Sequence, residues 1–234
     1  YQFLIISTFQ IVAVVLLTPF NVSRLYIVDK EKNMLEQFEM LPGMPFQYVT
    51  AKMFLVLAVH ALLFISGLPV SALSCIYTGI SGIKLVRLGL MILLYAFWSG
   101  TISIFFYTVC SKSVWAFAST IFVQLMFGIG TLMLAEAFRN GSLMMSGSGR
   151  IAPEVVAVCL VLLALNPLSS YMGFYGSITG DIGLFGTFCS HLGIDTSDKW
   201  FILLFYKMSN LVCLLTGIVF LVLSIWYMDR RKRT

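Results

Sequence analysis

Charged side chains are spaced so unevenly along this 234-residue chain that they divide it into long apolar runs. A helix needs about 20 mostly apolar residues to cross the hydrocarbon core of a bilayer. Six uncharged stretches reach that length: 1–23, 53–83, 88–111, 113–135, 155–180 and 208–228. The pattern therefore predicts several membrane-spanning helices.

The first span is predicted from Tyr1 to about Asn21, where Pro19-Phe20-Asn21 would end it. Residues 24–52, which follow, form the longest charged stretch of the chain. Within this stretch apolar residues recur at three- and four-residue steps, while charged residues occupy another face. We therefore expect an amphipathic helix over 28–42, closed by Leu41-Pro42-Gly43.

Further spans are predicted at 51–70, 85–110, 114–135 and 200–228. Two stretches rich in Gly and Ser, 71–83 and 136–150, predict loops. Ser111-Lys112-Ser113 is a very short connection, so the spans on either side of it must be antiparallel neighbours.

The run 155–180 differs from the others, because Pro153 opens it and Asn166-Pro167 interrupts it. Its helical part, 154–165, has 12 residues. At ~1.5 Å per residue these cover only about 18 Å of a core that is about 30 Å thick. We therefore predict a short re-entrant helix pair that turns at Asn166-Pro167.

The positive-inside rule selects this topology. If 154–180 only dips into the membrane, nine lysines and arginines lie inside the cell and six outside. If 154–180 crosses, the numbers become seven and eight. The dipping model therefore places 24–52 and the tail Arg230-Arg231-Lys232-Arg233 in the cytoplasm, and the re-entrant pair on the outer side.

Composition excludes a water-soluble domain. Hydrophobic residues make up 59% and charged residues 11% of the chain, with a mean hydropathy of +0.95, whereas soluble domains carry roughly 25% charge. The net charge of +5 comes from scattered residues and one tail, which does not indicate nucleic-acid binding. The sequence predicts an all-α, multi-pass helical bundle of the plasma membrane, with 1–234 as one domain. Because Tyr1 already lies in apolar sequence, we expect a preceding piece.

Enzymatic motifs are largely missing. The sequence has no phosphate-loop motif and no His/Cys set with metal-ligand spacing, and His60 and His191 stand alone. Ser81, in Gly79-Ile80-Ser81-Gly82, permits an intramembrane serine protease as a remote alternative, but a Gly/Ser surface turn explains it better. The five cysteines form no CxxC pair, and a disulfide between Cys75 and Cys189 stays open.

Polar residues inside the spans have two possible roles. No ionisable residue is expected at the centre of a span. Uncharged polar residues do occur there, and they could form interhelical hydrogen bonds or line a substrate path. They are Ser7, Thr8, Gln10, Ser119, Thr120, Gln124, Ser209 and Asn210.

Two motifs resemble the type-2 permeases of ATP-binding-cassette (ABC) exporters. After an acidic/basic pair, the family has E-x-G-T-L-E-x-L-L-x-T-P, with a Gly-Lys at the start of the next span. This chain has Asp29-Lys30-Glu31-Lys32-Asn33-Met34-Leu35-Glu36-Gln37-Phe38-Glu39-Met40-Leu41-Pro42 and then Ala51-Lys52, with Asn33, Met34 and Glu39 as departures. Pro153 and Asn166-Pro167-Leu168 are similar to the family's extracellular P-x-W…NPL-x-Y segment.

The resemblance covers nearly the whole chain, as the second to sixth helices of a six-helix unit with about five spans present. It implies the permease subunit of an ATP-driven exporter, not an enzyme itself. The partners it implies are ABC ATPase subunits, a second permease copy or homologous half, and membrane lipid. ATP and Mg would bind the ATPase, and this chain would bind no cofactor or metal.

The resemblance also assigns roles to individual residues. It implies that the helix over 28–42 and the Lys112 turn dock against the ATPase. It further implies a substrate path lined by 1–23 and 113–135, where Gln10 and Gln124 would orient an apolar cargo. The docking residues would be Glu31, Leu35, Glu36, Phe38, Glu39, Pro42 and Lys112. A non-transporting scaffold that uses the same helix to recruit a partner remains an alternative.

Overall fold

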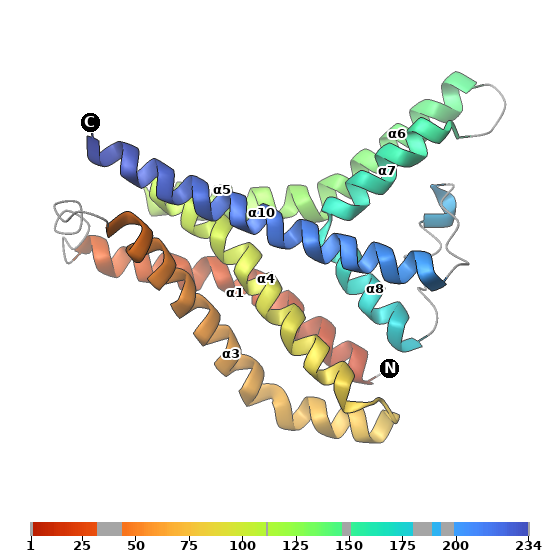
Figure 1. Ribbon diagram of the computed structural model, residues 1–234, viewed down its shortest axis with the longest axis horizontal. Coiled ribbons are helices and arrows are strands. Elements are labelled where there is room, and N and C mark those ends of the chain that lie inside the picture. Colours follow the sequence, from red (N-terminus) through yellow and green to blue (C-terminus); the bar gives the residue numbers. More distant parts are fainter. Residues whose placement is uncertain are drawn as a thin grey trace. The chain divides into compact units, whose positions relative to one another are not determined.

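A computed structural model describes residues 2–31, 44–110, 112–146, 151–179, 189–192 and 199–233. Throughout this part of the chain the regular elements are helices, and it contains no strand (Figure 1). Five helical segments in it are long and apolar enough to cross a membrane. The predicted all-α transmembrane architecture is therefore confirmed.

The first helix is longer than predicted. α1 runs over Gln2–Glu31 with Pro19 inside it, so the expected end near Asn21 is wrong. Proline removes the N–H that would bond the Val15 carbonyl oxygen four residues back. The Ser99 hydroxyl of a neighbouring helix donates to that oxygen at 3.5 Å, so the helix continues past the proline.

The second span is also longer than predicted. α3 covers Met44–Thr78 with Pro69 inside it, so the loop expected from residue 71 is wrong over 71–78. Serine and threonine hydroxyls in such a helix donate to carbonyls of the preceding turn, as Thr78 Oγ1 does to the Ser74 oxygen at 2.6 Å. The connection is only Gly79–Ser81, where Gly79 has a positive φ of 68°.

α4, Gly82–Val109, is the most buried of the five long helices and agrees with the predicted span at 85–110. It packs against both α1 and α3. Two glycines allow close approach, because a Cβ on Gly89 would meet the Phe64 ring and one on Gly100 would meet Met53 and Val56. α4 is therefore the central helix of its unit.

The fourth span continues beyond its predicted end. α5 (Ser113–Leu125), a π-helical turn η1 (Met126–Gly130) and α6 (Thr131–Ser146) follow one another without a break. The flexible stretch expected over 136–150 is therefore wrong for 136–146, which are helical. The π turn was not predicted either, because the apolar pattern of this stretch indicated one continuous span.

The short helix and the break after it are as predicted. α7 covers Pro153–Leu165 and α8 covers Pro167–Thr179. The two are bent by 89° at Asn166. The re-entrant course of this pair and its placement on the outer side of the membrane stay predictions. The last helix, α10, runs over Lys199–Arg233.

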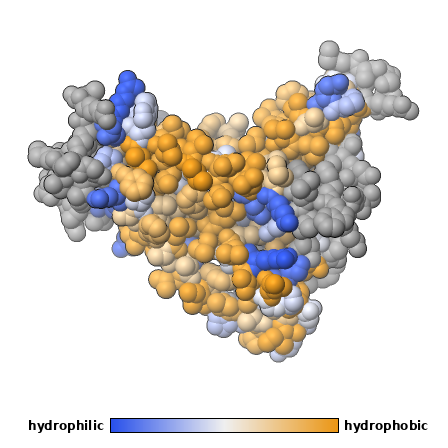
Figure 2. Space-filling view, viewed as in Figure 1, coloured by the Kyte–Doolittle hydropathy of each residue, from blue (hydrophilic) through white to orange (hydrophobic). Residues whose placement is uncertain are grey.

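These helices form two compact units. Unit 1 contains Tyr1–Phe122 and Leu214–Thr234, and unit 2 contains Val123–Cys213. Apolar side chains cover much of the visible surface of the described residues (Figure 2), and Phe9 and Phe54 are among the most exposed of them. Such a surface suits contact with lipid. The single permease domain over 1–234 stays a prediction.

Gly173 of α8 packs so closely on α10 that an added methyl group would collide with it. A Cβ at Gly173 would lie 2.7 Å from the Cβ of Tyr206. Rotation about side-chain bonds cannot move that atom, because it is attached directly to the backbone. We expect Gly173→Ala to lower the free energy of unfolding by about 1–3 kcal/mol, measured in mixed detergent micelles.

Gly141→Ala in α6 is the matched control, because no atom lies within 4 Å of the added methyl group. Alanine favours a helix over glycine by about 0.5–1 kcal/mol, so this variant should be slightly more stable than the parent. Equal stability of the two variants would contradict the close α8–α10 contact.

Candidate functional site

The adjoining ends of α1 and α3, which flank residues 32–43, are joined by a buried ion pair. Asp29 lies in the last turn of α1, and Lys52 lies in the third turn of α3. The Lys52 Nζ is 2.5 Å from the Asp29 Oδ2, and the two side chains are only 14% and 11% exposed. The C-terminal end of α1 and the N-terminal part of α3 are thereby joined to each other.

Further donors and aromatic rings complete this pair. The Tyr48 hydroxyl donates to Asp29 Oδ2 at 2.7 Å. The Lys52 Nζ donates to the Leu25 carbonyl oxygen at 3.4 Å and lies 5.3 Å from the Tyr48 ring centre. A buried ion pair is favourable only when its remaining hydrogen-bonding capacity is met in this way. We call Asp29, Tyr48 and Lys52 the α1–α3 anchor.

A hydrophobic cluster connects the anchor to three other helices of unit 1. Tyr26 stacks on Tyr107 of α4, with ring centres 5.6 Å apart, and meets Tyr48 edge-on. The buried members of the cluster are Val22, Tyr26, Tyr48, Val49, Met53, Val56, Ile104, Tyr107 and Ala116. Leu221, Ile225 and Met228 of α10 pack against it. A displacement of the anchor would therefore shift the packing of α4, α5 and α10.

The predicted ATPase-docking residues fall largely outside the described part of the chain. Those outside are Leu35, Glu36, Phe38, Glu39 and Pro42, and with them most of the amphipathic helix predicted over 28–42. Glu31 is the last residue of α1. Lys112 lies exposed in the bend before α5.

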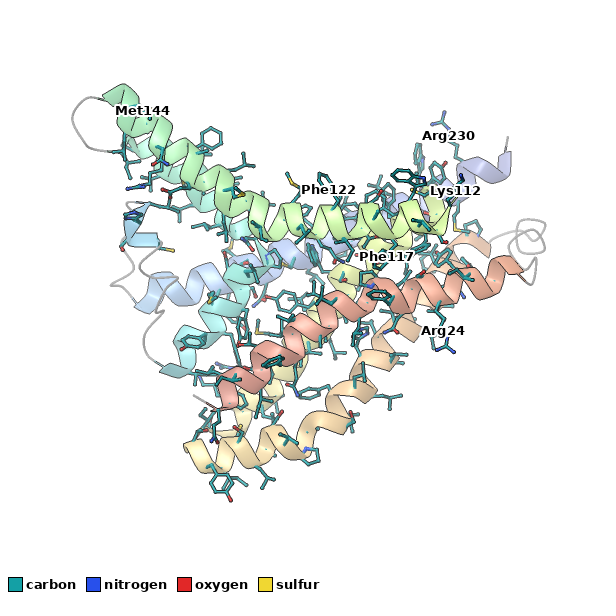
Figure 3. All side chains as sticks on the ribbon, turned by 180° about the vertical axis from the view of Figure 1, so that it is seen from behind. Arg24, Lys112, Phe117, Phe122, Met144 and Arg230 are labelled. Carbon is teal, nitrogen blue, oxygen red and sulfur yellow. The ribbon has the colours of Figure 1, made fainter. Side chains whose placement is uncertain are left out.

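Lys112 shares its end of unit 1 with two other exposed cations. Figure 3 shows Arg24 of α1, Lys112 and Arg230 of α10 at this end. The Arg230 guanidinium lies over the Trp226 ring, 5.4 Å from its centre. The anchor therefore belongs to a basic end of the unit.

The ion pair between Asp29 and Lys52 was not predicted from the sequence. The available signal was a pair of opposite charges, one just after the first apolar run and one at the start of the next. In a helical hairpin those positions lie at the same membrane boundary. The length of α1 hid this signal, because the span was expected to end well before Asp29.

In unit 2, Asn166 joins three elements at the sharp bend. Its Oδ1 accepts from the Leu168 backbone N–H at 2.8 Å, which caps α8. Its Nδ2 donates to the Gly128 carbonyl of the π turn at 2.7 Å, and its own carbonyl accepts from the Ser209 hydroxyl of α10 at 3.2 Å. The side chain is fully buried. Asn166 thus holds together both sides of the bend that the sequence predicted.

The two glutamines proposed for the substrate path lie in different units. Gln10 sits between α1 and α3, where its Nε2 donates to Ser71 Oγ at 3.1 Å and approaches Gly67. Gln124 is buried in the last turn of α5. For Gln10, the interhelical hydrogen bond is therefore observed. A role for either residue on a path stays a prediction.

The sequence suggested that His60 stands alone, but the structure gives it a partner. It lies fully buried near the middle of α3, and its Nε2 is 3.0 Å from Thr18 Oγ1 of α1. The prediction that ionisable residues are absent from span centres considered only Asp, Glu, Lys and Arg, and so it missed this histidine. Its position ten residues into an apolar run was the available signal.

The remaining candidates fit simpler explanations. Ser81 is exposed in the turn before α4, as expected for a surface turn. All five cysteines are free, including Cys75 and Cys189. Burial raises the pKa of the Cys189 thiol to about 12, which makes it a poor nucleophile at neutral pH. In the described part of the chain, His, Cys, Asp and Glu form no group that could hold a metal.

Comparisons with protein-family models, curated proteins and solved structures found no match. What the chain does is therefore inferred from its own residues and geometry.

The α1–α3 anchor predicts a non-additive pair of substitutions. Lys52→Met would leave the Asp29 carboxylate without its cation, and Asp29→Asn would leave the ammonium without its anion. We expect each to cost about 2–4 kcal/mol of unfolding free energy. The double variant should cost at least about 1 kcal/mol less than the sum of the two.

The measurement is equilibrium unfolding in mixed detergent micelles. Arg139→Met is the control, because Arg139 pairs with Glu136 three residues away in the same helix, where such pairs contribute about 0.2–0.5 kcal/mol. Additive losses for Asp29 and Lys52 would show that the two do not interact in the folded protein.

Asn166 predicts a difference between two substitutions. Asn166→Ala removes the cap of α8 and the donor to Gly128, and we expect it to cost about 2–4 kcal/mol. Asn166→Gln has the same groups on a longer side chain that cannot reach Leu168 N–H and Gly128 O together, so it should not restore stability. Unfolding measurements that find Asn166→Gln as stable as the parent would contradict the cap geometry.

Proposed function

We propose that this chain is the membrane permease subunit of an ATP-driven exporter of the type-2 ABC class, and that a separate polypeptide supplies ATP hydrolysis. The observation that carries the proposal is the α1–α3 anchor. It joins the ends of α1 and α3 on either side of residues 32–43, which contain most of the sequence that resembles the ATPase-docking helix of that class. A segment on which a partner pushes must be rigidly attached to what it moves.

The length of α1 supports a cytosolic position for this segment. Thirty residues cover about 45 Å at ~1.5 Å per residue, whereas the hydrocarbon core is about 30 Å thick. The last turns of α1, including Asp29, therefore extend beyond the core. Arg24, Lys112 and Arg230 lie at the same end of unit 1, which favours the cytoplasmic side under the positive-inside rule.

In the proposed mechanism, the ATPase contacts the predicted docking helix over 28–42 and the exposed Lys112 bend. Movement of the segment displaces the ends of α1 and α3 together, because Asp29 and Lys52 are paired. The hydrophobic cluster that includes Tyr26 and Tyr48 transmits this displacement to α4, α5 and α10. Packed helices respond to such a push by discrete rigid-body shifts, which is how alternating access is commonly achieved.

Several parts of the proposal concern partners. ATP and Mg bind the ATPase, and this chain contributes no nucleotide site. A second permease copy or a homologous half completes the path, on which Gln10 and Gln124 would contact a largely apolar cargo. The re-entrant pair α7–α8 then lies on the outer side.

Charge reversal in the docking segment tests the proposal. The full chain is purified in mild detergent from its native membrane, and the recovered proteins are identified by mass spectrometry. We expect an ATPase with a phosphate-loop motif to accompany the parent chain and to hydrolyse ATP. Glu36→Lys combined with Glu39→Lys should reduce that ATP turnover at least tenfold. In the proposal these two carboxylates pair with basic residues of the ATPase, which the new lysines would repel.

Glu154→Lys is the matched control, because Glu154 is an exposed carboxylate in the first turn of α7 and does not belong to the predicted docking residues. It should leave both recovery and turnover unchanged. Recovery of partners that include no ATPase would overturn the proposal and favour the scaffold. Turnover unaffected by the double reversal would argue against coupling through residues 32–43.

A further inference from the structure

A buried histidine lies in the apolar interior of unit 1. His60 is fully buried near the middle of α3, within a candidate membrane span. Its Nδ1 is 2.8 Å from the Val56 carbonyl oxygen, and its Nε2 is 3.0 Å from Thr18 Oγ1. Thr18 Oγ1 is in turn 2.6 Å from the Val14 carbonyl oxygen. Four groups therefore form a continuous chain of three short contacts between α3 and α1.

Counting protons along this chain shows that a neutral histidine cannot complete it. The Val56 and Val14 carbonyls at its two ends can only accept hydrogen bonds. Three contacts therefore need three protons. A neutral imidazole and one hydroxyl supply two, whereas an imidazolium and one hydroxyl supply three.

With a neutral imidazole, one contact must lack a proton. If the proton is on Nδ1, it is donated to Val56, Nε2 can only accept, and the Thr18 hydroxyl can donate to Nε2 or to Val14 but not to both. If the proton is on Nε2, no proton lies between Nδ1 and the Val56 carbonyl. With an imidazolium, both ring nitrogens donate and the Thr18 hydroxyl is free to donate to Val14. The three contacts of this chain are therefore all satisfied only when His60 carries one proton more than the neutral ring.

The surroundings supply no carboxylate that would hold this proton permanently. α3 packs against α1 and α4, and in the parts of these helices beside His60, 2–23, 53–78 and 88–109, the sequence has no Asp, Glu, Lys or Arg. On α4, the titratable residue at the level of His60 is Tyr95. It lies between Gly89, which packs against Phe64 of α3, and Gly100, which packs against Val56 of α3.

The nearest charged residues along the two helices are Lys52 on α3 and Arg24 on α1, eight residues from His60 and six from Thr18. The cost of an unpaired cation in an apolar interior opposes the extra proton, and the additional hydrogen bond favours it. Proton binding is therefore conditional on pH.

We propose that Thr18 and His60 form a proton-binding site within the membrane-spanning part of unit 1. Binding of one proton completes the hydrogen bonds between α3 and α1. Histidine is suited to such a role, because its proton exchanges near physiological pH, and ionisable groups inside a membrane domain usually have a function. The proposal does not depend on the chain being a permease.

The test uses the full chain in lipid nanodiscs with ¹⁵N-labelled histidine. The chain has two histidines, and His191→Gln leaves only the His60 signals. Ring-nitrogen NMR spectra recorded from pH 8.5 to pH 4.5 distinguish a neutral ring, with one protonated nitrogen, from an imidazolium with two. We expect a neutral Nδ1–H ring at high pH and conversion to the imidazolium within this range, with the helices intact by circular dichroism.

Thr18→Val, made in the same background, removes the hydroxyl with little change of shape. It should weaken proton binding at His60 about tenfold or more, because the imidazolium loses its partner at Nε2. Thr18→Ser keeps the hydroxyl and should restore the parent titration. Thr50→Val is the matched control, because the Thr50 hydroxyl contacts only carbonyls of its own helix, at Phe46 and Gln47.

Two outcomes would overturn the proposal. One is a ring that stays neutral at every pH in the range. The other is a titration that Thr18→Val leaves unchanged, which would show that Thr18 does not belong to the site.

Discussion

Backbone polar groups cannot bond to water inside a hydrocarbon core, so a chain that crosses a membrane must satisfy them itself. This constraint accounts for the helical form of the described residues and for the small set of polar contacts between the helices. Where Pro19 interrupts the hydrogen bonds of α1, the Ser99 hydroxyl of α4 donates to the Val15 carbonyl oxygen, which lacks its helical partner. Where Asn166 separates α7 from α8, its amide caps one helix and binds the π turn of another. At both of these irregularities a polar side chain thus meets backbone groups that the helix itself leaves without a partner.

The same constraint gives a buried ion pair unusual importance. Asp29 and Lys52 form an ion pair between different helices, and they occur where two long helices leave the apolar region. Tyr48 and the aromatic rings beside them exclude water and meet the remaining hydrogen-bonding capacity. A buried pair of this kind adds little net stability, but separating its members is costly. The anchor is therefore better suited to keeping two helix ends together during movement than to stabilising the fold.

The sequence predicted the elements of this fold better than their ends. Gaps between charges located all five long apolar helices, and the steric rule for Asn166-Pro167 located the sharp bend, because both signals are local. The ends at Asn21, Val70 and Ala135 were predicted too early, since Pro, Ser and Gly end helices in water but not in an apolar environment where an unmade backbone hydrogen bond is expensive. The Asp29–Lys52 and Thr18–His60 contacts join residues 23 and 42 positions apart. Only the packing of α1 on α3 brings them together, and one sequence does not reveal that register.

The length of α3 has a consequence for the lipid around the protein. Its uncharged part, 53–78, has 26 residues, or about 39 Å at ~1.5 Å per residue, which exceeds a core of about 30 Å by roughly a third. Such hydrophobic mismatch is relieved when the helix tilts, when it kinks at Pro69, or when the bilayer thickens locally. Each of these responses changes with acyl-chain length. The thickness of the host bilayer therefore acts directly on the angle at which α3 meets its neighbours.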